Sequence, residues 1–411
     1  MSVIVLLPLA VIVVLLVMRK HMMVAGICGA LVAMAVGQIG VAKAGKIIMD
    51  TIPGMLSMVV PVMYSATALA LAKTGGFEAL LSLSRKIIGN RLYLVAAAIV
   101  LIQSMATYAA GLGAGNTMVT GPLAFAVIGA IPQLIAAMAI GTAASFITSP
   151  SSAESAALSK IAGIEVSAYV EQMLPFTVSF WVLAMLLAAY GVWKKGSLLN
   201  KESKEERPLG DILRLAAAPI YFIIVVVAGK YLNMLLGGYA LFTPSFNMIS
   251  TLVLAIILTK APMDRVSEDL IQGSAFILTR LFSIGVFLGF INILSDLGTF
   301  KYIAKLTAFA PSFIYVPAAI ITGFLVAVPS GAYSVGVITL IMPVLAEVGL
   351  TPVQMGVVAL AIGMGTQMSP VQINVASLSQ TFQMEIQQVV RNNAPYVIGM
   401  LAIITVLGFF V

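Results

Sequence analysis

Long apolar runs follow one another along almost the whole chain, separated by short polar stretches. Their length matches the roughly 20 residues that an α-helix needs to cross the hydrocarbon core of a bilayer. The pattern therefore predicts an all-α polytopic membrane protein. The first run lacks a basic leader and a cleavage signal, so we expect a span there rather than a signal peptide. The expected spans cover 2–18, 22–41, 53–72, 132–148, 172–193, 213–229, 245–259, 272–296, 352–368 and 390–411.

Two further features lie between the third and fourth spans of each half of the chain. An amphipathic segment, at 75–90 or 298–309, is typical of a helix at the membrane interface. A long apolar stretch follows, interrupted by glycine and serine at 111–117 or 328–334. We interpret each stretch as a re-entrant hairpin, because irregular backbone at membrane depth is tolerated only beside a cavity or inside protein.

Two of the expected spans end in similar polar stretches, TSPSSAE at 148–154 and MSPVQIN at 368–374. Pro150 and Pro370 each lack an N–H group and clash with the preceding turn, so the helix must stop there. A stopped helix exposes N–H groups that attract an anion and carbonyls that suit a cation. We therefore predict a helix break with binding capacity in each of these spans.

A constant shift of 220 residues relates the two halves. It pairs the prolines Pro132 and Pro352, Pro150 and Pro370, and Pro175 and Pro395. Between 149 and 175, eight residues equal their partners without a gap, where this composition gives about two by chance. We infer a duplication, with a first repeat at 1–193, a polar linker at 194–212 and a second repeat at 213–411.

The repeats are expected to have inverted topology, because about five transmembrane helices plus a re-entrant hairpin and a broken helix make an odd number of crossings. Lysine and arginine concentrate in cytoplasmic loops, and a cytoplasmic linker places most of them on one side. That side then holds Arg19, Lys20, Lys73, Arg85, Lys86, Arg91, Lys260 and Arg265. We therefore expect a multi-pass protein of the cytoplasmic membrane of a prokaryote.

Composition narrows the function classes. Hydrophobic residues make up 61% of the 411 residues and charged residues 9%, against about 25% charged in soluble domains. The net charge of +7 is scattered over the loops, which argues against nucleic-acid binding. A single cysteine, Cys28, and a single histidine, His21, leave no basis for a disulfide framework or a histidine or thiolate metal site. We expect no enzyme, no metal and no cofactor beyond a coupling ion, Na⁺ or H⁺.

Matched broken helices in inverted repeats are typical of secondary transporters, whose site lies at mid-membrane between the repeats. Neutral hydroxyls, amides and backbone dipoles at the breaks suit a small carboxylate bound together with Na⁺. An alternative for each single break is that Ser-Pro pairs only kink helices while serines bond their own backbone. The predicted substrate-binding residues are Asn116, Thr117, Ser149, Ser151, Ser330, Ser369, Gln372 and Asn374. The predicted cation-binding residues are Gly115, Asn116, Thr148, Glu154, Ser334 and Thr366.

Two charged residues inside apolar regions have open roles, since charge near the membrane interior indicates function. Glu154 lies in the first break, opposite the neutral Asn374 in the repeat. It coordinates a cation, carries a coupling proton or points into an outer vestibule. Arg280 either pairs with a substrate carboxylate or extends to the cytoplasmic interface.

At these residues the chain resembles the ion transporter superfamily, which includes anaerobic C4-dicarboxylate carriers and divalent anion/sodium symporters. Segment 136–176, with its Ser/Pro-rich break and short following helix, looks most like the dicarboxylate carriers. GNT at 115–117 partly matches the hairpin-tip motif of the symporters, with Gly115 in place of serine. The resemblance implies a homodimer and an elevator-like movement of 92–193 and 311–411 over the remaining spans.

The sequence thus predicts a secondary active transporter for a small organic anion, a di- or monocarboxylate. The chain contains no GxxxxGK[ST] motif, which disfavours an ATP-driven pump. A cation/proton antiporter of the same superfamily is one alternative, with Glu154 as its titrating acid. An anion channel is another. A membrane-embedded enzyme is disfavoured because no acid/base or metal cluster is evident.

Overall fold

Helices make up nearly all of the described part of this computed structural model, which contains no strand. The described residues are 3–18, 20–56, 59–88, 91–111, 113–150, 152–195, 208–307, 310–331, 334–347 and 349–411. The first half contains α1 (Leu7–Val17), α2 (Met22–Gly37), α3 (Val41–Leu56), α4 (Val59–Lys73), α5 (Gly76–Ile88), α6 (Leu92–Ala110), α7 (Gly113–Ile128), α8 (Pro132–Thr148), α9 (Ala153–Ala162) and α10 (Val166–Lys195). The second half contains α11 (Leu209–Leu235), α12 (Pro244–Thr259), α13 (Met263–Asp296), α14 (Thr299–Thr307), α15 (Tyr315–Ser330), α16 (Ser334–Glu347), α17 (Pro352–Thr366), α18 (Ile373–Thr381) and α19 (Ile386–Leu407).

Four of the described helical segments are long and apolar enough to cross a membrane. They are Val166–Lys195, Leu209–Val226, Ser312–Ser330 and Ile386–Leu407, and the bent pair α8 and α9 makes a fifth if it counts as one span. Seven shorter apolar helices accompany them. At 1.5 Å per residue, a 16-residue helix is about 24 Å long, less than the roughly 30 Å hydrocarbon core. The described helices are those of a multi-pass membrane protein, with fewer full-length spans than the ten predicted.

Turns that the apolar pattern concealed account for part of this difference. The predicted span 22–41 contains α2, which ends at Gly37, and Gln38 follows in the left-handed conformation. A left-handed residue cannot continue a right-handed helix, so the chain turns although the apolar character continues. Most of the predicted linker 194–212, namely residues 196–207, is outside the described residues.

Helix starts in the two halves recur at the predicted shift of 220 residues. α8 and α17 begin at Pro132 and Pro352, where the missing N–H of proline is not needed. The next two pairs, α9 with α18 and α10 with α19, also begin 220 residues apart. The amphipathic segments form α5 and α14, and the apolar stretches after them form the helix pairs α6–α7 and α15–α16.

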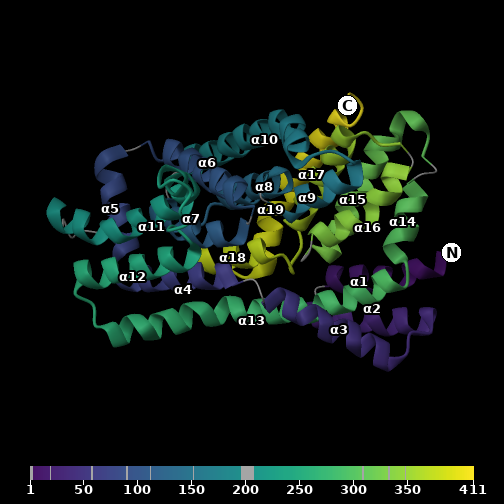
Figure 1. The fold of residues 1–411 in the computed structure, drawn as a ribbon, viewed down its shortest axis with the longest axis horizontal. Helices are drawn as coiled ribbons and strands as arrows, with labels where there is room; N and C mark the ends of the chain where they lie inside the picture. The colour runs from purple at the N-terminus through teal and green to yellow at the C-terminus, as the bar shows by residue number, and fades with distance from the viewer. Residues whose placement is uncertain are drawn as a thin grey trace.

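The halves differ at α13, which is continuous over 34 residues where the first half has the two helices α3 and α4. α13 runs along one long side of the molecule (Figure 1) and packs against both α3 and α4. A Cβ at Gly289 would lie 2.9 Å from Ile48 Cα of α3, and one at Gly273 would lie 2.8 Å from Ala66 Cα of α4. Small residues thus allow close backbone approach, as is common between membrane helices.

The most deeply buried helices are α8 and α17. Every residue from Leu134 to Thr148, and every one from Met355 to Thr366, is buried. A helix that is apolar on all sides is stable only when neighbours surround it. α8 and α17 pack against each other near the middle of the molecule (Figure 1), where a Cβ at Gly363 would lie 2.6 Å from Ile147 Cγ1. Their C-terminal ends, and hence both polar stretches, lie in this central region.

Candidate functional site

At both polar stretches the chain leaves the helix. α8 ends at Thr148, Ser149 is extended, and α9 begins at Ala153 after a 45° bend. The Ser152 hydroxyl caps α9 by accepting a hydrogen bond from the Ser155 N–H, which satisfies one of the helix's unpaired donors. α17 ends at Thr366, and α18 begins at Ile373 with the Gln372 side chain accepting from the Ile373 N–H. Local capping therefore stabilises both interruptions.

A continuous group of buried side chains, which we call the amide network, joins the first hairpin to the second break. Each member is at most 3% exposed. The members are Gln103 of α6, Thr117 and Thr120 of α7, Thr142 of α8, Gln367 after α17, and Asn374 of α18. All six are neutral amides or hydroxyls, so the network has hydrogen-bond donors and acceptors without a fixed charge.

Gln103 organises the half of the network that belongs to the first half of the chain. Its Nε2 donates to the Thr142 hydroxyl at 2.6 Å and to the Thr117 hydroxyl at 2.9 Å. Its Oε1 accepts from the Thr120 hydroxyl at 2.8 Å. Since the Gln103 amide uses both its nitrogen and its oxygen, it fixes α6, α7 and α8 relative to one another.

Asn374 connects this group to the second half of the chain. Its Oδ1 accepts a hydrogen bond from the Thr117 hydroxyl at 2.5 Å, across 257 positions of sequence. Its Nδ2 donates to Gln367 Oε1 at 2.8 Å. Gln367 is held in turn by its own donation to the Thr366 hydroxyl at 3.1 Å and by Asn393 Nδ2, which donates to its carbonyl at 3.0 Å. Buried polar groups connected in this way rigidify the site they form.

The first break contains an acidic counterpart of this contact. Ser334, the first residue of α16, donates to Glu154 Oε1 at 2.6 Å. Glu154 is the second residue of α9, and Asn374 is the second residue of α18, 220 positions later. Each residue therefore accepts a hydroxyl hydrogen bond from the hairpin helix of the other half. Within the described ranges, no group of three or more His, Cys, Asp or Glu residues is placed to hold a metal ion.

Four of the predicted hydroxyl ligands have partners in the protein backbone or in neighbouring side chains. Thr148 donates to the Ala144 carbonyl at 2.8 Å and accepts from Thr177 at 2.8 Å. Ser149 donates to the Tyr108 carbonyl at 2.5 Å. Ser330 donates to the Val326 carbonyl, and Thr366 donates to the Gly363 carbonyl at 2.7 Å. These contacts agree with the alternative in which serine and threonine satisfy nearby backbone groups.

The remaining predicted residues lie in several environments. Asn116 is buried in the first turns of α7, and Ser369 is buried beside Gly331, where a Cβ would lie 2.5 Å from Ser369 Cβ. Gly115 faces α4, since a Cβ there would lie 3.3 Å from the Tyr64 ring. Ser151 and the side chain of Arg280 lie outside what the structure describes.

Sequence reasoning missed Gln103, Thr120 and Thr142 of the amide network. Gln103 carried a signal, because a lone amide inside the apolar stretch of α6 must find a partner in the protein interior. Thr142 carried none, because its counterpart at the 220-residue shift is the apolar Ile362 and a threonine in a membrane helix can bond its own backbone. Only the packing of α6 against α8 reveals its role.

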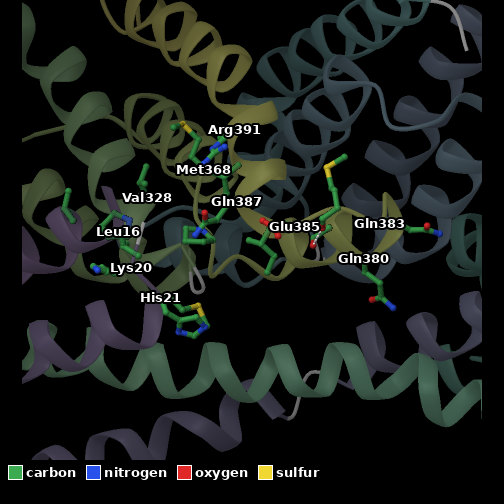
Figure 2. Close-up of a pocket in the computed structure, with 18 residues that line it drawn as sticks. Leu16, Lys20, His21, Val328, Met368, Gln380, Gln383, Glu385, Gln387 and Arg391 are labelled. Carbon is green, nitrogen blue, oxygen red and sulfur yellow. Dashed lines mark hydrogen bonds between the residues drawn. The ribbon is translucent and has the colours of Figure 1, made fainter. Parts of the chain in front are cut away.

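A cavity of about 1000 Å³ opens beside the second break. Its lining includes Met368 and Pro370 of the break and Pro329 of the second hairpin. Figure 2 shows Lys20 and His21 on the side of α1 and α2, with Gln387 and Arg391 on the side of α19. The lining of the cavity therefore combines the charged side chains Lys20, Glu385 and Arg391 with residues of the second break.

No protein-family model matches the chain, and no curated protein matches it in sequence. Among solved structures, the chain is similar to the YdaH transporter of Alcanivorax borkumensis, whose crystal structure is described as revealing an unusual topology. The identity is 13%, the match covers 90% of this chain and 89% of that one, and the TM-score is 0.47. A likeness at this level assigns neither substrate, coupling ion nor mechanism.

Proposed function

We propose that the protein is a secondary active transporter that moves a small organic anion, a di- or monocarboxylate, with Na⁺ or H⁺ as the coupling ion. The observation that carries the proposal is the hydrogen bond from Thr117 to Asn374 inside the amide network. It joins a hairpin of one half to a helix break of the other, at buried polar groups in an otherwise apolar interior. Sites at mid-membrane between repeats are typical of such transporters.

The anion would bind where Thr117 and Asn374 now bond each other. Opening this contact frees the Thr117 hydroxyl as a donor, and Asn374 Nδ2 and Gln103 Nε2 lie next to it in the network. α18 begins directly after the same break, and the N–H groups of its first turn favour a negative charge there. The outer part of this site would then contain Asn116, Ser149, Ser330, Ser369 and Gln372.

Neutral donors explain why the anion would need a coupling ion. Burial of an unpaired charge costs far more than burial of a hydrogen-bonded pair of opposite charges. A cation at the carbonyl ends of α8 and α17, near Thr148 and Thr366, or a proton or Na⁺ on Glu154 beside Ser334, offsets that cost. The affinity for the anion then rises when the coupling ion is bound, and the affinity for the coupling ion rises by the same factor when the anion is bound.

The matched contacts also support two repeats related by a two-fold axis, which the odd number of expected crossings per repeat would make inverted. α7 packs against α18, and its counterpart α16 packs against α9. We propose that 92–193 and 311–411 move together in an elevator-like manner over the remaining helices of a homodimer in the cytoplasmic membrane. The cavity beside Met368 and Pro370 would be the access route from the side that carries Lys20 and His21, which the proposed topology places in the cytoplasm.

Uptake by the purified protein in proteoliposomes tests the proposal. A thermal-shift screen against carboxylates and inorganic oxyanions, with and without Na⁺, first selects the anion. We expect saturable uptake of that labelled anion and its accumulation above equilibrium only under an inward Na⁺ or H⁺ gradient. Flux that neither saturates nor responds to an ion gradient would indicate an anion channel instead.

Glu154 supports one second candidate, a cation/proton antiporter, because it is an acid at a helix break with a hydroxyl partner from the other half. Its test is proton release from acid-loaded proteoliposomes on addition of Na⁺ without any organic anion. Antiport predicts release that Glu154→Gln abolishes. Anion symport predicts no release under these conditions.

A further inference from the structure

A second cavity, of about 300 Å³, lies away from both breaks, where the ends of α4 and α12 meet the start of α13. None of its lining residues belongs to the amide network or to the Glu154 contact. The lining residues are Lys73, Thr74, Thr259, Lys260, Ala261, Pro262, Arg265, Val266 and Asp269. Three cations and one carboxylate therefore surround a small space.

Two of these four charges, Lys73 and Asp269, neutralise each other, and the other two do not form an ion pair among the described residues. Lys73 Nζ lies 3.0 Å from Asp269 Oδ1 and donates to Gln272 Oε1 at 2.9 Å. Asp269 is only 4% exposed, so this ion pair forms part of the cavity wall. Among the described residues, no ion pair joins Lys260 or Arg265 to a carboxylate. The cavity thus retains an excess of two positive charges.

The backbone holds these cations in place. Lys260 has a φ of 56°, in the left-handed region that non-glycine residues rarely adopt, and ends α12. The Thr259 hydroxyl accepts from the Ala261 N–H at 3.3 Å and donates to the Ala255 carbonyl at 2.7 Å, which fixes the turn. α13 follows two residues later. The N–H groups of its first turn add positive potential, part of which the Asp264 carboxylate in the same turn offsets.

An exposed apolar stripe leads to this cavity along α12. Ile249, Val253 and Ile257 follow one another at intervals of four residues and are 56%, 50% and 66% exposed. Residues with this spacing lie on one face of a helix. The stripe ends one turn before Lys260, so an apolar face and a basic cavity adjoin on the same helix.

We propose that this cavity binds a phosphate group, carried by the headgroup of an anionic phospholipid whose acyl chains lie along the α12 stripe. Arginine, lysine and helix N-terminal amides are the groups that bind phosphate oxygens in proteins. Basic pockets on the cytoplasmic side of membrane helices bind anionic headgroups, and the lysine and arginine distribution places this cavity on that side. The lipid would brace α4, α12 and α13 against one another.

Lipid binding to the purified protein, independent of transport, tests the proposal. The double variant Lys260→Asn/Arg265→Gln removes the excess charge, and asparagine tolerates the left-handed conformation. Both residues are exposed, so folding should be retained. The matched control is Lys301→Gln/Lys305→Gln, which removes the same charge from α14. The readouts are native mass spectrometry and the melting temperature with phosphatidylglycerol, phosphatidylcholine or glycerol 3-phosphate.

We expect phosphatidylglycerol to bind to and stabilise the wild type and the α14 control, and phosphatidylcholine to do so much less. The double variant should bind phosphatidylglycerol at least about tenfold more weakly. If glycerol 3-phosphate alone stabilises the wild type but not the double variant, the phosphate site stands and its ligand is soluble. Equal binding of both lipids, or unchanged phosphatidylglycerol binding by the double variant, would overturn the proposal.

Discussion

At the first break Glu154 accepts a hydrogen bond from Ser334, whereas at the second break Asn374, at the same register, accepts one from Thr117. The local structure is alike, because each residue is the second of the short helix that follows the break. The surroundings differ. Asn374 belongs to a network of neutral side chains, while Glu154 can carry a charge and is partly exposed.

This difference fits the two tasks of the coupled transporter that we propose. An amide keeps the same hydrogen-bonding pattern at every physiological pH, which suits recognition of a substrate. A carboxyl group changes between an anion and a neutral acid, which suits binding and release of a proton or a cation. We therefore infer that the second break recognises the substrate and the first break couples it to an ion gradient.

The largest effect is expected for Asn374→Ala. The change removes the Asn374 acceptor of the Thr117 hydroxyl and the donor to Gln367 Oε1 in a buried site. Each buried group left unsatisfied in this way costs about 1–3 kcal/mol. Uptake in proteoliposomes should fall by about tenfold to a hundredfold. Asn292→Ala, which removes a hydrogen bond from α13 to Thr51 away from the breaks, is the matched control and should retain uptake. Equal loss in both variants would show that Asn374 only stabilises the fold.

The next largest effect is expected for Glu154→Gln. The amide still accepts the hydrogen bond from Ser334 but cannot carry a proton or neutralise a cation. Exchange of anion across the membrane should persist, while accumulation driven by the ion gradient disappears. Glu165→Gln, at an exposed residue three positions after α9 ends, should leave accumulation intact. Gradient-driven accumulation in the Glu154 variant would remove this residue from coupling.

A third variant, Asn374→Asp, converts the second break to the chemistry of the first. An ionised carboxylate can accept from Thr117 but has no donor for Gln367, and it repels an anionic substrate. Uptake should be weak at neutral pH and recover toward acidic pH, where the carboxyl group is neutral. A pH profile that matches the wild type would argue against substrate binding at this residue.

Steric contacts at the hairpins predict a smaller effect, on stability. A Cβ at Gly331 would lie 2.5 Å from Ser369 Cβ and 2.8 Å from the Ala327 carbonyl oxygen, whereas one at Gly399 has open space. Overpacking of this kind costs about 1–3 kcal/mol. Gly331→Ala should therefore lower the melting temperature, and Gly399→Ala should not. Equal melting temperatures of the two variants would show that the tip of the second hairpin can move away from the second break to accommodate the added methyl group.

The smallest effect is expected for Ser330→Ala. The Ser330 hydroxyl donates to the Val326 carbonyl of its own helix. Without this hydroxyl, the Val326 carbonyl still accepts the backbone N–H bond of the helix. Uptake should change by less than about twofold. A loss as large as that of Asn374→Ala would place Ser330 in the inner part of the site, beside Thr117 and Asn374.

Local chemistry explains which parts of the site were predictable. Pro150 and Pro370 indicated the two interruptions because each stands among hydroxyl and amide residues that can bond freed backbone groups. Proline alone would not have done so, since Pro175 and Pro395 lie inside α10 and α19. The partners of the polar side chains do not follow. Ser149 reaches the Tyr108 carbonyl 41 positions earlier, and Thr142 reaches Gln103 across 39 positions. Such contacts depend on how α6, α7 and α8 pack.

The sequence by itself determined the helical class, the repeated helix starts and the two interruptions, because hydrophobic periodicity and proline act over a few neighbouring residues. The tertiary structure alone decided that Thr117 meets Asn374 and that Ser334 meets Glu154, across 257 and 180 positions. A buried hydroxyl bonds whichever acceptor the packing of the helices brings within reach, and several acceptors along the chain are chemically equivalent. Only the folded arrangement of α7 against α18 and of α16 against α9 selects among them.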